Sequence, residues 1–101
     1  MTYDYQTSLD AWLDVQEKLG RRQREVLLAL YHLKEATNME IANYLKWSIN
    51  RVTPRMLELR EMGLVEQKCI RKCKITGNNA RVWRLTMDGF NRVRQICIKL
   101  Q

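Results

Sequence analysis

The sequence predicts a mainly α-helical fold with one small β-hairpin. Three observations support this prediction: two short amphipathic helical patterns meet at a tight turn within residues 37–63, an extended pattern follows Gly63, and a helical period returns after Thr86. We expect one domain over residues 1–101. It comprises an N-terminal helix at 8–19, a three-helix core with the hairpin at 21–85, and a C-terminal helix at 86–100.

The first helical pattern begins at Thr37. Thr37 and Glu40 have the spacing of a capping box, which satisfies free N–H groups at a helix start. Ile41, Tyr44 and Leu45 then follow at the spacing of one expected buried face, and the small Ala42 lets another helix approach closely.

After a turn at 46–49, a second helix is expected to begin near Ser48 or Asn50 and to stop at Gly63. We expect Pro54 in its first turn, where a missing N–H has no intrahelical partner to lose. The predicted inward positions of this helix are Val52, Met56 and Leu59. The predicted outward face is polar and mainly cationic, and consists of Asn50, Arg51, Thr53, Arg55 and Glu58. This pattern is typical of a helix-turn-helix whose second helix enters the major groove of DNA.

Two further helices are expected before this unit. Residues 21–34 place Val26, Leu27, Leu30 and Leu33 at helical spacing and should form the first helix of the core, with His32 off that stripe and at the surface. Residues 35–36 could form a brief strand. The helix at 8–19 shows an apolar stripe that serves either as extra core or as part of a subunit interface.

Beyond Gly63, Leu64–Ile75 and Val82–Leu85 are rich in strand-forming residues, and Thr76–Asn79 suits a hairpin tip. The cations of this hairpin gather towards its loop: Lys68, Arg71, Lys72, Lys74, Arg81 and Arg84. We expect Trp83 to anchor the sheet to the helices. Thr86 should cap the last helix, whose stripe forms either a core face or half of a dimer interface: Phe90, Val93, Ile96, Cys97 and Leu100.

Charge and composition narrow the classes of function. The net charge is +7, and residues 48–85 hold nine Lys and Arg against three Asp and Glu. Such a basic sector favours a polyanionic partner, although basic excess also occurs on ordinary solvated surfaces. No signal peptide or membrane-spanning run is recognisable, so we expect a cytoplasmic protein. The odd count of three cysteines predicts free thiols, and we expect no metal site, no cofactor and no catalysis.

The order of helices, turn and basic hairpin resembles the winged helix-turn-helix superfamily. The likeness covers about residues 21–90 and rests on MEIANYL, INRVTPRMLELREMGLV and RKCKITGNNARVWRLT. The middle segment is similar to MarR-like and ArsR-like bacterial regulators. Its combination with the hairpin resembles small winged-helix proteins encoded in bacteriophage genomes.

The resemblance implies a sequence-specific transcriptional regulator that binds double-stranded DNA in the cytoplasm of a bacterium or a phage-infected host cell. It implies a homodimer formed through the Leu9–Leu19 and Phe90–Leu100 helices. An alternative is a protein-protein interaction adaptor for a replication or transcription machine. The implied DNA-binding residues are Ser48, Asn50, Arg51, Thr53 and Arg55 on the recognition helix and Arg71, Lys72, Lys74 and Arg81 on the wing.

Overall fold

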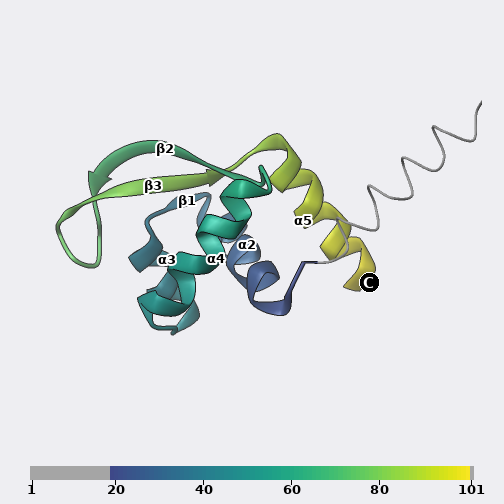
Figure 1. Cartoon of the computed structure of the whole chain (residues 1–101), viewed down its shortest axis with the longest axis horizontal. Helices are drawn as coiled ribbons and strands as arrows, with labels where there is room; N and C mark the ends of the chain where they lie inside the picture. Colours follow the sequence, from purple (N-terminus) through teal and green to yellow (C-terminus); the bar gives the residue numbers. More distant parts are fainter. Residues whose placement is uncertain (1–18, 101) are drawn as a thin grey trace, which may run out of the picture.

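The computed structural model describes residues 19–100, with side chains through Ile98, and the predicted helix at 8–19 lies outside these residues except for Leu19, which is not helical. Figure 1 shows the arrangement of the described elements. In chain order they are α2 (Arg21–Leu33), β1 (Glu35–Ala36), α3 (Asn38–Leu45), α4 (Ile49–Glu61), β2 (Val65–Lys72), β3 (Asn79–Leu85) and α5 (Met87–Leu100). The winged helix-turn-helix class, with a three-helix core, a hairpin and a C-terminal helix, is confirmed.

The core lies where α2, α3 and α4 meet. Each helix contributes apolar residues at helical spacing, and β3 and α5 close the core from the other side. Trp83 is buried in this core, so its predicted role as an anchor between sheet and helices is confirmed. The other central residues are Val26, Leu27, Leu30, Ile41, Val52, Met56, Leu59, Leu85 and Val93.

The sheet is antiparallel with strand order β1-β3-β2, so the predicted brief strand at 35–36 adds a third strand beside the hairpin. Ala36 pairs with Trp83. The register of β2 against β3 shifts between Gln67 and Cys69, which leaves Lys68 as an extra residue on β2. The hairpin extends beyond the helices, and its loop end lies far from α5 (Figure 1).

The hairpin loop begins earlier in the chain than predicted, and β3 begins already at Asn79. Ile75 was expected within a strand, but β2 ends at Lys72 and Ile75 lies in the loop, 45% exposed. The loop is closed by two backbone hydrogen bonds, from the N–H of Cys73 to Asn78 and from the N–H of Gly77 to Cys73, each 2.8 Å long. Gly77 adopts a φ of 77°, which favours glycine at this position.

The capping box of α3 is confirmed, because the backbone N–H of Glu40 donates to the Thr37 hydroxyl and the Thr37 N–H donates to Glu40. The predicted burial of Tyr44 is wrong, since its side chain is 48% exposed. At 100° per residue, the buried direction set by Ile41, Ala42 and Leu45 lies roughly 100° away from position 44. Tyr44 therefore lies at the edge of the helix and outside the core.

In α4 the predicted inward residues Val52, Met56 and Leu59 are all buried, and Gly63, with a φ of 76°, follows the end of the helix. The expected place of Pro54 is wrong. The helix begins at Ile49, so Pro54 is its sixth residue and lies beyond the first turn. The carbonyl of Asn50 consequently has no N–H donor at position 54.

The C-terminal helix α5 packs on the body through one side. The Thr86 hydroxyl accepts a hydrogen bond from the Gly89 N–H and donates to the Gly63 carbonyl, which confirms the predicted cap. Val93 is buried, whereas Phe90 is 47% exposed. The predicted stripe is thus a core face on its Val93 side and an open surface on its Phe90 side. None of the described helices has the length and apolar character needed to span a membrane.

Candidate nucleic-acid interface

The start of α4 presents a polar surface. Asn50, Arg51 and Thr53 are exposed there, and Ser48 precedes the helix as its N-cap. The Arg51 guanidinium lies 5.8 Å from the centroid of the Trp47 ring, a cation–π contact worth ~0.5–1 kcal/mol at an exposed site. This contact holds a cation beside the turn between α3 and α4.

Arg55 differs from Arg51 because a carboxylate holds it. Its Nε and Nη2 donate to the two oxygens of Glu58 at 2.7 and 3.0 Å. Gln23 of α2 donates to the same carboxylate at 2.8 Å. The hydrogen bonds from Gln23 and then Arg55 lower the pKa of Glu58. Arg55 therefore sits on the side of α4 that faces α2, with its Nη1 uninvolved in this pair.

The six cations predicted on the hairpin divide into two groups. Three form ion pairs that fasten the hairpin: Lys68 with Glu35 at 2.8 Å, Arg71 with Glu40 at 2.7 Å, and Arg84 with Glu66 at 2.7 Å. The other three, Lys72, Lys74 and Arg81, have no carboxylate partner within residues 19–98. All three lie at or near the loop, so the uncompensated charge of the hairpin is concentrated at that end.

Glu40 connects the hairpin to α3. Both of its oxygens accept from Arg71, at 2.7 and 2.9 Å, and it also accepts from the backbone N–H groups of Lys74 and Thr37. The Arg71 hydrogen bond, helped by these backbone donors, lowers the pKa of Glu40 to about 2. One carboxylate thus completes the helix cap and also fixes the base of the loop.

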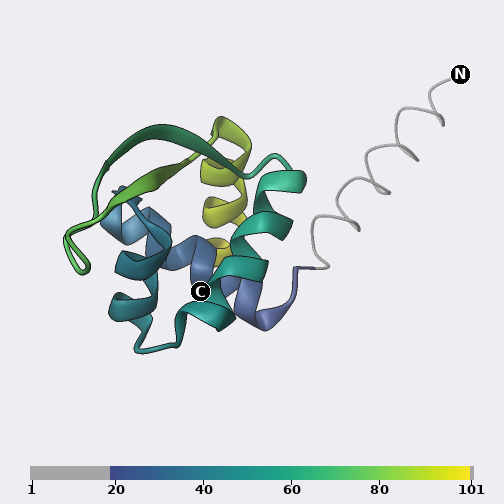
Figure 2. The same cartoon turned by 60° about the vertical axis from the view of Figure 1, so that its left-hand side comes forward.

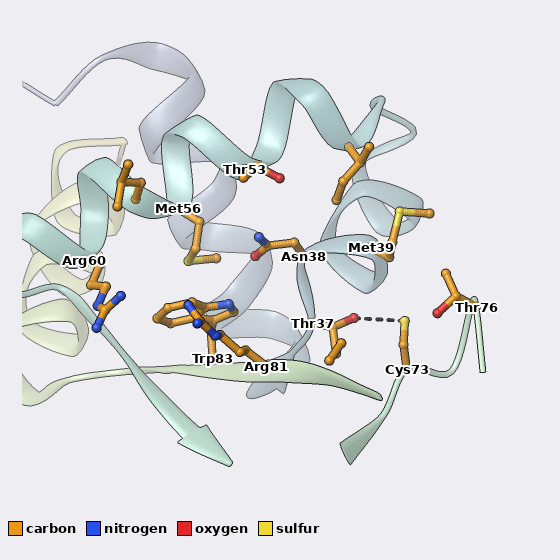
Figure 3. A pocket seen from close by; sticks show the side chains of 13 residues that line it. Thr37, Asn38, Met39, Thr53, Met56, Arg60, Cys73, Thr76, Arg81 and Trp83 are labelled. Carbon is orange, nitrogen blue, oxygen red and sulfur yellow. Dashed lines mark hydrogen bonds between the residues drawn. The ribbon is translucent and has the colours of Figure 1, made fainter. Parts of the chain in front are cut away.

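A hollow of about 350 Å³ lies between α4 and the hairpin (Figure 3). Met56 and Trp83 line its apolar part, and the Arg60 guanidinium lies 5.6 Å from the centroid of the Trp83 ring. Thr53 of α4 and Arg81 of β3 line it from opposite elements. α4 and the hairpin therefore border this depression on two sides, and residues 37–39 at the start of α3 line it as well.

The cysteines are free thiols. Cys73 is buried beside the loop, with its sulfur 3.1 Å from the Thr37 hydroxyl. Burial raises its pKa, but hydrogen bonds from Thr37 and from residues 75 and 76 outweigh that effect and lower it. Among residues 19–98, no three His, Cys, Asp or Glu side chains gather in a way that could hold a metal ion. His32 is exposed and meets the Tyr31 ring edge-on.

Sequence reasoning missed the acidic partners of two predicted DNA-binding cations. It assigned Glu40 only to a helix cap and Glu58 only to an outward face. Glu40 lies 31 residues from Arg71, and Gln23 lies 35 residues from Glu58. No local pattern signals these two long-range contacts, whereas Arg55 and Glu58 are three residues apart on one helix, a spacing that local sequence does signal.

No protein-family model and no curated protein matches this sequence significantly. Solved structures match its fold. A ZitR mutant of Lactococcus lactis matches with a TM-score of 0.66 and 25% identity over 80% of this chain and 52% of that chain. A MarR mutant from E. coli, complexed with operator DNA, matches with a TM-score of 0.62 and 19% identity over 77% of this chain and 53% of that chain. A further structure, a MarR family transcription regulator, matches with a TM-score of 0.68 and 19% sequence identity, and the match covers 97% of this chain and 64% of that chain.

The chain thus spans about half the length of the ZitR and MarR chains it matches. The fold that the chain shares with MarR and with a MarR family transcription regulator agrees with the fold that the resemblance implied.

Proposed function

We propose that this protein is a transcription regulator that binds double-stranded DNA by placing α4 in the major groove and the basic hairpin beside it. The observation that favours this most is the hollow bordered by α4 and the hairpin. Thr53 near the start of α4 and Arg81 of β3 line this hollow, and the other unpaired cations of the hairpin, Lys72 and Lys74, lie at its loop end. The shared fold with MarR, which is solved in complex with operator DNA, supports the same assignment.

In this proposal the start of α4 reads base edges. Arg51 can make two parallel hydrogen bonds to guanine, and Asn50 can do the same with adenine, each contact discriminating by ~1–3 kcal/mol. Ser48 and Thr53 add single hydrogen bonds from either side of these two residues. Arg55 contributes through the part of its guanidinium that Glu58 leaves open.

The hairpin supplies contacts to the backbone. A helix in the major groove and a wing over the adjacent minor groove have one phosphate strand between them. The hollow lies where this strand would run, with Arg81 at its edge. Lys72, Lys74 and Arg81 would neutralise phosphates directly. Arg71 would do so only if it broke its ion pair with Glu40.

Salt dependence of binding tests this proposal. Neutralising roughly five phosphates predicts a log–log slope of affinity against salt of about −4 to −5. We expect this slope in fluorescence-anisotropy titrations with duplex DNA, and a slope less steep by about 2 for Lys72→Gln/Lys74→Gln. The duplex used for specific binding is identified by selecting, from a pool of random duplex sequences, those that the protein binds. An affinity that ignores salt, or a selected pool that shows no preferred sequence, would contradict the proposal.

We also infer a homodimer through the predicted 8–19 helix and the C-terminal helix, because Phe90 and Ile98 are large apolar side chains exposed on α5. The same surface supports the second candidate function, an adaptor that binds a protein partner. A partner captured independently of salt, by a chain that does not shift duplex DNA, would favour the adaptor. A phage-encoded origin stays a prediction from the hairpin resemblance.

A further inference from the structure

We propose that Arg21 and Arg22, at the start of α2, form a second contact to the DNA backbone on the side of α4 opposite the hairpin. This inference rests on the proposed function and adds a surface that the resemblance did not imply. The ligand of that surface is the phosphate backbone of duplex DNA.

The first observation is a cationic depression between α2 and α4. It has a volume of about 480 Å³ and is lined by Gly20, Arg21, Arg22, Gln23, Arg55 and Glu58. Arg21 and Arg22 are exposed, and neither has a carboxylate partner within residues 19–98. The one carboxylate of the lining, Glu58, is already engaged by Arg55 and Gln23. The guanidinium groups of Arg21 and Arg22 are therefore available to an external anion.

The second observation is the position of this depression. The residues of α4 that line it are 55 and 58, whereas the residues of α4 that line the hollow beside the hairpin include 53, 57 and 60. At 100° per residue these two sets point to opposite flanks of the helix. Figure 2 shows the start of α2 beside α4, on the side away from the hairpin loop. Unpaired cations thus border α4 on both flanks.

This arrangement matches the surroundings of a recognition helix. The major groove is about 12 Å wide, so a helix within it has a phosphate backbone along each side. The hairpin can reach the backbone on one side only. Arginine suits the other side because its planar guanidinium binds phosphate oxygens through two parallel hydrogen bonds.

The test compares two charge-matched double variants of the full chain. Arg21→Gln/Arg22→Gln should make the salt slope less steep by about 2 and should weaken selected and random duplexes alike. Lys34→Gln/Arg84→Gln removes the same charge from the other end of α2 and from an exposed arginine of β3 that is already paired with Glu66, and should leave the slope unchanged. Circular dichroism confirms that both variants keep the helical content of the wild type.

Phosphate ethylation interference then locates the contact. In the wild type we expect interference along both walls of the groove. The Arg21 and Arg22 variant should lose it on one wall, and Lys72→Gln/Lys74→Gln should lose it on the other. A wild type that binds specifically, while the Arg21 and Arg22 variant keeps both slope and pattern, would overturn this inference. A wild type that does not bind duplex DNA would instead overturn the proposed function.

Discussion

At the scale of single residues, a carboxylate decides how much of Arg55 is available to DNA. Both Glu58 oxygens accept from Arg55, and Gln23 holds the same carboxylate from α2. Two cations one helical turn apart on α4 therefore have different surroundings. Arg51 lies over an aromatic ring and has no carboxylate partner within residues 19–98, whereas the charge of Arg55 is compensated within the protein.

This compensation predicts that Glu58→Gln strengthens DNA binding. The amide keeps the size of the side chain and an oxygen that accepts from Arg55, but it removes the negative charge near the phosphates. We expect affinity for every duplex to rise about three- to tenfold and the salt slope to steepen by about 1, as measured by anisotropy. Asp88→Asn removes a charge from α5 and serves as the control for net charge. Equal effects of the two substitutions would show that Arg55 has no special role.

At the scale of elements, the hairpin is oriented by ion pairs between segments far apart in sequence. Glu40 is the most connected of the acidic partners, since it accepts from Arg71 and from two backbone N–H groups. Its side chain is only 9% exposed, while the Glu66 and Arg84 side chains are 45% and 50% exposed. The Glu40 link should therefore contribute more to stability than the Glu66 link.

We expect Glu40→Gln to lower the free energy of unfolding at pH 7 by about 2 kcal/mol. The folded-state pKa of Glu40 is lowered to about 2 from an ordinary value of 4.5. Its contribution is therefore fully present above pH 4.5 and is lost as the pH falls towards 2. Urea unfolding at a series of pH values should show the gap between wild type and variant narrowing over this range. Glu66→Gln, which breaks an exposed pair, should cost less than about 1 kcal/mol. A gap that does not change with pH would rule out this role for the Glu40 charge.

The elements themselves were predictable from the sequence because their signals are local. The stripe of Val52, Met56 and Leu59, the cap at Thr37 and the stop at Gly63 each depend on neighbours within one or two helical turns. The prediction for Tyr44 was wrong because each residue turns the helix by 100°, so a small error in the direction of the buried face exposes a residue at its edge. The prediction for Pro54 was wrong because the first residue of a helix is uncertain by one or two positions from sequence. The pairing of Arg71 with Glu40 could not be predicted, because it depends on how the hairpin folds back on α3.

At the scale of the whole molecule, α5 offers a surface separate from the proposed DNA-binding one. The unpaired cations of the proposed DNA-binding surface belong to α2, α4 and the hairpin. On α5 the apolar side chains of Met87, Phe90 and Ile98 are exposed, with Arg94 among them, and Phe90 meets the exposed Tyr31 of α2 edge-on. Apolar side chains of this size that gather on one helix mark a surface suited to a partner. A second copy of the chain is the partner that we propose.

A dimer would present two copies of α4 to one duplex and so predicts two-fold symmetry in the bound sequence. Size exclusion with light scattering should give twice the mass of one chain, and the selected duplex should contain inverted half-sites about one helical turn apart, roughly 34–36 Å. Ile98→Glu places a charge on a side chain that is 70% exposed, so it should leave the fold intact, halve the mass and weaken binding to the full site more than to a half-site. Tyr44→Glu adds the same charge at an exposed aromatic residue of α3 and should not change the mass. If the wild type has the mass of one chain while binding a single, non-palindromic site, α5 is not a self-association surface and its apolar side is left for another protein.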